Sequence, residues 1–156
     1  MIVKGEHTFP GPRAVVWELL QDPAVLQKAM PGARELTLVD DGVYEGVIRI
    51  GVGPVTAAEW TLKVTLRDRV PPEHYVMDVD SRGGIGFTRG SADVALDEVD
   101  ETTTRMRYSA DLQVGGRVAS VGQRLLDQVA KMMTKQGLDA MGRELNARLA
   151  GDGGAA

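Results

Sequence analysis

The sequence contains no cysteine and only two histidines, His7 and His74. The absence of cysteine excludes disulfides, thiolate catalysis, zinc–thiolate sites and iron–sulfur clusters. A metal site usually needs three ligands, and a catalytic histidine needs a nucleophile and an orienting carboxylate beside it. The spacing around the two histidines suggests neither arrangement. We therefore expect no metal site and no catalytic residue, with His74 on the surface and His7 facing inward.

The sequence also lacks an excess of positive charge and any long hydrophobic run. Its 18 lysines and arginines are outnumbered by 22 aspartates and glutamates, so no nucleic-acid partner is expected. No uninterrupted apolar run approaches the roughly 18 residues of a membrane-spanning helix. The N-terminus lacks the basic and apolar segments of a signal peptide. These absences predict a cytoplasmic protein.

The remaining composition is that of an ordinary globular domain, with 43% apolar and 26% charged residues. A chain of 156 residues has the usual length of one domain. It buries roughly 68–70% of its surface on folding, which leaves interior volume to spare for a ligand. We predict a single domain over residues 1–149 and a flexible, glycine- and alanine-rich tail over residues 150–156.

Turn residues divide the first third of the chain into short elements. The pattern predicts a strand over Ile2–Phe9 and then a helix whose first turn contains Pro12. Asp22-Pro23 reads as a cap and first-turn proline for a second short helix, which ends near Met30.

Strict alternation of apolar and polar residues follows, over residues 36–114. Trp60, Leu62 and Val64, for example, alternate with Thr61 and Lys63. Such segments, separated by turns, predict about six strands of an antiparallel sheet with one covered face.

The spacing changes after the last of these strands. Apolar residues recur at intervals of three and four between Val118 and Leu145, which is typical of a helix. We predict a helix from residue 117 to about residue 149, roughly 50 Å long at about 1.5 Å per residue, with a kink at Gly137.

Together these elements predict an α+β fold in which a curved antiparallel sheet of about seven strands wraps around the long C-terminal helix, with two short helices after the first strand. An open sheet must cover its apolar face, and the long helix is the one element large enough to do so. Because a curved sheet seldom closes completely around a helix, we expect a cavity between them.

This element order is similar to the helix-grip fold of the START, pollen-allergen and polyketide-cyclase (SRPBCC) superfamily. Local motifs resemble, more specifically, the carbon monoxide dehydrogenase G-subunit (CoxG) family over residues 1–149. The motifs that carry this resemblance are Pro12-Arg13, Val16-Trp17, Asp22-Pro23, Met30-Pro31-Gly32, residues 44–46, 51–55, 90–96 and 108–110, Val114-Gly115-Gly116-Arg117-Val118-Ala119, and residues 122–126.

The resemblance implies an accessory role. Proteins of this family are encoded with molybdenum-containing carbon monoxide dehydrogenases and related hydroxylases. They have been associated with membrane recruitment and with binding an isoprenoid quinone such as menaquinone, and no tightly bound cofactor is expected. Many members continue into an apolar tail, whereas this sequence ends in glycine and alanine. We therefore expect transient contact with the inner face of the membrane rather than stable anchoring.

The predicted cavity is the candidate site. Methionines adapt to irregular apolar shapes, and a tyrosine can bind one polar end of an apolar ligand. The small inward residues Gly46, Gly90, Ala92 and Ala110 favour a void, although larger partners would instead fill the space. The residues expected to bind the ligand are Trp60, Met77, Met106, Tyr108, Val121, Leu125, Val129, Met132, Met133 and Gln136, with Tyr108 and Gln136 engaging a quinone carbonyl.

Three hypotheses of function remain open. The first is a non-catalytic carrier of an isoprenoid quinone or similar lipophile that serves a molybdenum hydroxylase. The second is an enzyme of the cyclase or hydrolase kind on the same fold, which would need an acid–base pair in the cavity. The third is a pure assembly factor that contacts the hydroxylase through its surface and has an incidental pocket, and a core filled by side chains would favour it.

Overall fold

The computed structural model describes residues 1–52 and 54–154 of the chain. Its elements, in chain order, are β1 (Ile2–Phe9), α1 (Arg13–Gln21), α2 (Pro23–Ala29), β2 (Ala33–Asp40), β3 (Val43–Val52), β4 (Val55–Val70), β5 (His74–Gly83), β6 (Gly86–Asp100), β7 (Thr103–Gly115), the 3-10 helix η1 (Arg117–Val121) and α3 (Gln123–Gly154).

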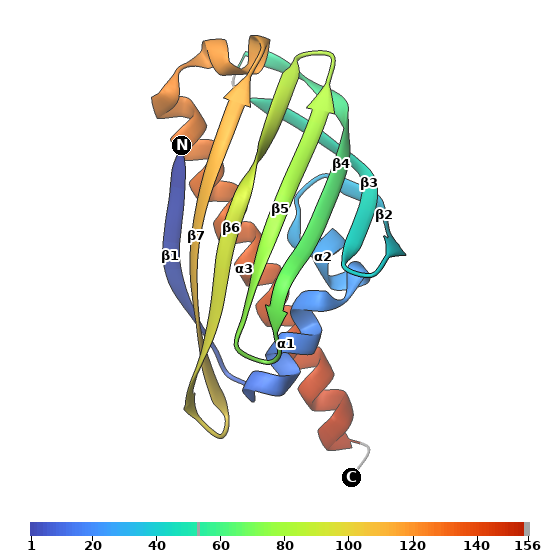
Figure 1. Cartoon of the computed structure of the whole chain (residues 1–156), viewed down its shortest axis with the longest axis vertical. Coiled ribbons are helices and arrows are strands. Elements are labelled where there is room, and N and C mark those ends of the chain that lie inside the picture. Colours follow the sequence, from blue (N-terminus) through green and yellow to red (C-terminus); the bar gives the residue numbers. More distant parts are fainter. Residues whose placement is uncertain (53, 155–156) are drawn as a thin grey trace.

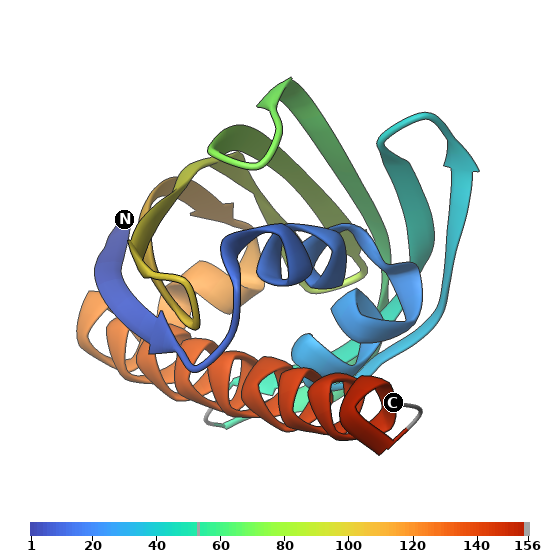
Figure 2. The ribbon, with the colours of Figure 1, turned by 90° about the horizontal axis from the view of Figure 1, so that it is seen from below.

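All seven strands form one antiparallel sheet in the order β1-β7-β6-β5-β4-β3-β2. The first strand therefore lies at one edge, beside the last strand, and β2 lies at the other edge. The sheet curves around α3 (Figure 1), and α1 and α2 lie across one end of the space between sheet and helix (Figure 2). The predicted α+β architecture, with seven strands around a long helix, is confirmed.

The junction of the two short helices is fixed by a cap that the sequence predicts. Asp22 accepts a hydrogen bond from the main-chain N–H of Ala24 at 2.9 Å, and Pro23 occupies the first helical position, as expected of a helix N-terminus. Arg148 of α3 lies 3.0 Å from the same carboxylate. The Tyr44 hydroxyl donates to the Gln21 carbonyl, so β3 is also tied to this junction.

The fully packed part of the core lies at the end of the sheet that α1 and α2 cover. Phe9, Val16, Leu19, Val64 and Leu145 have no exposed surface there. These side chains come from the end of β1, from α1, from the middle of β4 and from the last turns of α3. Neither α1 nor α2 reaches the opposite end of the sheet, beside η1 (Figure 1), and the site described below lies toward that end.

The C-terminal helix differs from its prediction at both ends. Residues 117–121 form the separate helix η1, and α3 begins at Gln123 and continues to Gly154, past the predicted boundary at residue 149. Gly116 and Gly122, which flank η1, have φ values of 83° and 95°. A right-handed helix cannot pass through such residues, which is why the predicted helix from residue 117 is wrong. Residues 155 and 156 of the predicted tail, and Gly53 of the motif at 51–55, lie outside the described residues.

Gly137 marks a close helix contact, not the predicted kink, since α3 is helical without interruption through this position. A Cβ at Gly137 would lie 2.5 Å from the carbonyl oxygen of Ala29 in α2. Glycine is therefore needed here so that the two helices can approach each other. Within the described residues, no helix is both long and apolar enough to cross a membrane.

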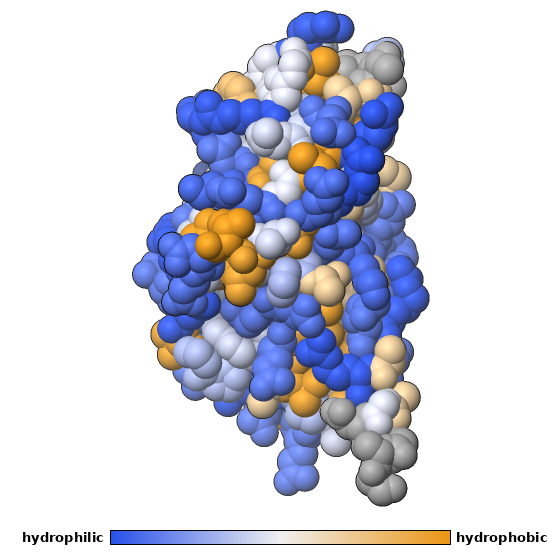
Figure 3. All heavy atoms as spheres, turned by 90° about the vertical axis from the view of Figure 1, so that its right-hand side faces the viewer, coloured by the Kyte–Doolittle hydropathy of each residue, from blue (hydrophilic) through white to orange (hydrophobic). Residues whose placement is uncertain are grey.

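The edge of the sheet at β2 exposes apolar side chains. Seen from this side, apolar side chains gather between polar ones at mid-height (Figure 3). Leu38 and Val39 of β2 are among the exposed large apolar residues, and neither lines the cavity described below. The exposed apolar residues of this edge are thus separate from the candidate site.

Candidate ligand-binding cavity

A cavity of about 390 Å³ lies between the concave face of the sheet and α3. This volume is at the lower end of the range of about 300–1,000 Å³ for small-molecule pockets. Its walls come from β1, from the concave faces of β3 to β7, from α1 and α2 with the turn that follows α2, and from η1 and α3. The expected cavity between sheet and long helix is therefore present.

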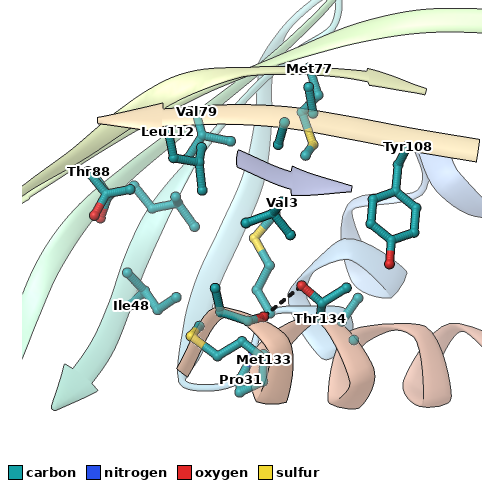
Figure 4. A pocket seen from close by; sticks show the side chains of 18 of the residues that line it. Val3, Pro31, Ile48, Met77, Val79, Thr88, Tyr108, Leu112, Met133 and Thr134 are labelled. Carbon is teal, nitrogen blue, oxygen red and sulfur yellow. Dashed lines mark hydrogen bonds between the residues drawn. The ribbon is translucent and has the colours of Figure 1, made fainter. Parts of the chain in front are cut away.

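The alternation of β7 supplies one wall. Met106, Tyr108, Ala110, Leu112 and Val114 all face the cavity, because every second residue of a strand points to the same side. The six steps from Tyr108 to Val114 span about 20 Å at about 3.3 Å per residue. Thr88, which pairs with Val114, and Tyr108 lie at opposite ends of the cavity (Figure 4). The cavity is therefore elongated along the strands.

One face of α3 supplies the opposite wall. Val129, Met133, Gly137 and Met141 follow one another at four-residue intervals, and each lines the cavity. Side chains at this spacing share a helix face. The adjacent Met132 points away from the cavity and is 52% exposed.

Few polar groups interrupt this apolar wall. They are the hydroxyls of Tyr75, Ser81, Thr88, Tyr108 and Thr134, together with the indole N–H of Trp60. The Thr134 hydroxyl already donates to the Ala130 carbonyl at 2.7 Å. Burial raises the pKa of Tyr75 far above its usual value, so this phenol stays neutral. Among the described residues, no aspartate, glutamate, histidine, lysine or arginine side chain lines this cavity.

Two of these polar atoms, Nε1 of Trp60 and Oγ of Ser81, are fully buried and have no hydrogen-bond partner. The two side chains are 3% and 5% exposed. Most buried polar groups in proteins are paired, so an unpaired one needs an explanation. The cavity wall can bind an apolar molecule and can offer it a small number of uncharged hydrogen-bonding groups.

The structure brings together six of the residues predicted to bind a ligand. Trp60, Met77, Met106, Tyr108, Val129 and Met133 all line the cavity.

The other four predicted residues do not line it. Val121 of η1 and Leu125 of α3 pack against the core as half-buried residues, whereas Met132 and Gln136 are exposed on the outer face of α3. Gln136 is therefore not placed to engage a ligand together with Tyr108. The break at Gly122 separates Val121 from the helix. Met133 and Thr134 line the cavity together, so Met132 lies on the side of Met133 that faces away from it.

Some lining residues were not predicted, although the sequence carried the signal for them. Ile48 and Ile50 of β3 line the cavity, as their alternation with Arg49 indicates. Ser81 and Thr88 lie on the same inward register of β5 and β6. Leu26, Met30 and Pro31 also line it, and their position depends on how α2 docks, which local periodicity does not reveal.

The small inward residues have two different roles. Ala92 and Ala110, which pair across β6 and β7, line the cavity as expected. Gly46 and Gly90 do not. A Cβ at Gly46 would lie 2.9 Å from the Arg34 carbonyl oxygen, and one at Gly90 would collide with the carbonyl oxygen of Asp111. These glycines allow neighbouring backbone to approach closely.

A smaller depression adjoins the cavity between β1 and α3. It shares Val3, Tyr108, Thr134 and Leu138 with the cavity. Polar residues complete its lining, namely Lys4, His7, Lys131, Lys135 and Asp139. This depression is the polar border of an otherwise apolar cavity.

The two histidines lie on opposite faces of the sheet. His7 packs edge-on against Phe9, with ring centroids 4.6 Å apart, on the inward face of β1. Burial lowers the pKa of His7 below its ordinary value of 6.5, while the Asp139 carboxylate opposes this shift. The ring of His74 lies 3.5 Å from the Asp93 carboxylate near the surface, as predicted.

The family comparison identifies one matching family. The family model of the carbon monoxide dehydrogenase G-subunit (CoxG) matches residues 5–146, and so covers most of the chain. No curated protein matches the chain.

Solved structures show the same fold. A conserved protein from Geobacillus kaustophilus is 28% identical, with 94% of this chain and 96% of that chain covered and a TM-score of 0.88. The Zhui aromatase/cyclase from Streptomyces sp. R1128 is 18% identical, with 96% and 95% covered and a TM-score of 0.70. A START superfamily protein from Mycobacterium smegmatis is 9% identical, with 94% and 97% covered and a TM-score of 0.71. The last two likenesses concern the fold alone.

Proposed function

Because the chain belongs to the CoxG family of carbon monoxide dehydrogenase, we propose that it is a non-catalytic accessory protein of a molybdenum-containing carbon monoxide dehydrogenase or related hydroxylase. It binds a lipophile in the cavity, and an isoprenoid quinone such as menaquinone is the ligand we infer. The observation that supports this proposal is the elongated apolar cavity, whose described lining carries no charged side chain.

The energetics of burial suit such a ligand. Each buried methylene contributes about 0.8 kcal/mol, so a five-carbon isoprene unit contributes roughly 4 kcal/mol. Association costs about 4–15 kcal/mol in lost freedom of motion. A quinone ring and its first isoprene units must therefore be buried together for useful affinity, and a cavity about 20 Å long along β7 is long enough for this.

The proposed role in the cell is delivery of the electron acceptor. A quinone is dissolved in the membrane, whereas the hydroxylase that would reduce it is a separate protein outside the membrane. A carrier that visits the inner face of the membrane transiently would supply quinone to the enzyme or recruit the enzyme to the membrane.

The alternative functions have weaker support. The similarity to an aromatase/cyclase is the reason to consider an enzymatic role. Such a role would require proton transfer, which needs a positioned acid or base. The described cavity wall offers only hydroxyl groups for this purpose. A surface-acting assembly factor would need no cavity.

The direct test is mass spectrometry of the organic extract from freshly purified protein, together with native mass spectrometry of the intact chain. We expect a stoichiometric quinone or other isoprenoid. Met133→Gln should lower the occupancy because it places an amide in the cavity wall. Met132→Gln is the matched control, since Met132 is exposed on the next position of the same helix, and it should leave the occupancy unchanged.

The contradicting outcome is also defined. If no lipophile is extracted, and none is taken up when menaquinone is offered, the carrier function is wrong and the assembly-factor alternative replaces it.

A further inference from the structure

The two fully buried, unpaired polar atoms of the described cavity wall, Trp60 Nε1 and Ser81 Oγ, belong to one small region. Trp60 pairs with Gly83, and the next inward residue of β4, Leu62, pairs with Ser81 of β5. Trp60 and Ser81 are therefore diagonal neighbours on the concave face, a relation that places residues about 7–8 Å apart. Ser81 in turn pairs with Thr88 of β6, so three polar side chains gather at the end of the cavity near η1.

The indole ring of Trp60 packs against Gly83 of the neighbouring strand β5. A Cβ at Gly83 would lie 3.0 Å from Cγ of the Trp60 ring, so the ring lies over this glycine. Trp60 is 3% exposed, and its N–H is a donor with no capacity to accept. The other described buried side-chain atoms without a partner belong to Arg13 and Gln21 of α1, and neither residue lines the cavity.

The rest of the wall differs in character from this end. Between Thr88 and Tyr108, the side chains of Val79, Leu112 and Met133 are apolar, and the Thr134 hydroxyl is already bonded to the Ala130 carbonyl (Figure 4). A molecule that pairs with the buried polar atoms near η1 and fills the space beyond them has a hydrogen-bonding group at this end and an apolar body next to it. A buried donor without a partner destabilises the protein, and an acceptor on the ligand would remove this cost.

We infer that Trp60 Nε1 and Ser81 Oγ form a carbonyl-binding site that orients the ligand, with its polar end near η1 and its apolar body along β7 toward Tyr108. This inference rests on the proposed lipophile-carrier function and deepens it. The group bound is an uncharged acceptor, such as a quinone or other ketone oxygen. A carboxylate or phosphate at this end would be buried without a cation, at a large cost in free energy.

The test compares two probes with the same ring skeleton, 2-methyl-1,4-naphthoquinone and 2-methylnaphthalene, which lacks the carbonyls. Their affinities are measured by competition against a fluorescent lipophile, Nile red, in the wild-type protein and in the variants Trp60→Phe and Ser81→Ala. The absence of cysteine removes the thiol that would otherwise react with the quinone.

We expect the wild-type protein to prefer the naphthoquinone roughly tenfold, the effect of about one buried hydrogen bond. Each substitution should reduce this preference several-fold while leaving the affinity for 2-methylnaphthalene equal or higher. Ser91→Ala is the matched control. Ser91 is exposed on the outer face of β6, where it bonds Asp78, and its loss should leave both affinities unchanged.

The outcomes separate this inference from the proposed function. Equal binding of the two probes by the wild-type protein overturns the carbonyl site but leaves the lipophile cavity standing, as does a preference that survives both substitutions. Failure of both probes to displace Nile red contradicts the proposed function, and the carbonyl site fails with it. Trp60→Phe and Ser81→Ala change different strands, so the test does not depend on one variant folding.

Discussion

Large apolar side chains on the concave face of the sheet differ in accessible surface according to which elements pack against them. Phe9 and Val64 have no exposed surface where α1 and α2 fill the space. Met77, Leu112 and Val114 point to the same face of the sheet, yet they keep accessible surface because they line the cavity. Partial burial of large apolar residues on an inward register thus marks the hollow part of this molecule.

The lowered pKa of His7 predicts how stability depends on pH. Burial disfavours the charged ring in the folded protein, so below pH 6.5 the unfolded chain binds more protons than the folded chain. Stability should therefore fall as the pH drops below about 6.5. Urea denaturation of the wild-type protein and of His7→Gln between pH 5 and 8 checks this, since the variant should lose less stability on acidification.

The groups that face His7 provide the control. Four charged residues share the depression with His7, namely Lys4, Lys131, Lys135 and Asp139. Of these, the Asp139 carboxylate raises the pKa of His7. Asp139→Asn should therefore make the loss of stability on acidification steeper. If the wild-type protein instead becomes more stable relative to His7→Gln as the pH falls, attraction by Asp139 dominates and the prediction is wrong.

At the scale of single elements, the sequence predicts which residues of the strands face inward, but for the long helix it predicts this only in part. The alternation around Trp60 predicts the inward face of β4 because a strand repeats every two residues whatever it packs against. The apolar stripe of α3 is broad, and its sequence alone did not distinguish Met133 from Met132. Docking against α2 and the sheet decides which methionine faces inward, and periodicity does not contain that information.

The glycines of α3 show the same limit. Gly137 and Gly142 each read as weak points of a helix, yet they have different surroundings. A Cβ at Gly137 would lie 2.5 Å from the carbonyl of Ala29, whereas a Cβ at Gly142 would meet nothing within 4 Å. The contact with α2 explains the first glycine, and the structure gives no packing reason for the second.

This pair yields a prediction for the α2–α3 contact. Alanine is favoured over glycine in a helix interior by about 1 kcal/mol, so Gly142→Ala should raise the free energy of unfolding by up to that amount. Gly137→Ala should lower it by about 1–3 kcal/mol, the cost of an overpacked contact, despite the same gain in helix propensity.

Thermal and urea denaturation of the two variants measure this difference directly. Each variant is the control for the other because the chemical change is identical and the positions lie five residues apart in one helix. An equal increase in stability in both variants would show that α2 and α3 do not approach closely at Ala29.

At the scale of the whole molecule, the fold is a shell that is packed at one end and hollow at the other. The general design could be predicted from sequence because an open sheet with one long helix leaves a space between them. The position of the hollow could not, because it depends on where α1 and α2 dock, and that docking is stabilised by distant contacts such as Arg148 with Asp22.

Filling the hollow should separate stability from binding. Ala110 lines the cavity at the centre of β7 and faces Ala92 on β6. Ala110→Leu adds three buried carbons, which should raise the free energy of unfolding by about 1 kcal/mol. The same change should reduce lipophile occupancy at least tenfold, as measured by native mass spectrometry after incubation with menaquinone.

Ala95→Leu is the matched control for this prediction, because Ala95 lies between the buried Val94 and Leu96 and so points to the outer face of β6. It should leave occupancy unchanged. A large loss of stability in Ala110→Leu would mean that the space beneath Ala110 is already filled, and would favour the assembly-factor alternative.

The border between β1 and α3 has a kinetic consequence. The two elements are in contact along the cavity, but within residues 1–52 and 54–154 no main-chain hydrogen bond joins them. Side chains such as Val3, Thr134 and Leu138 can therefore part there without breaking any strand pairing. If the proposed ligand leaves across this border, side-chain rearrangement there sets its residence time, and exchange can be fast in a protein that unfolds slowly.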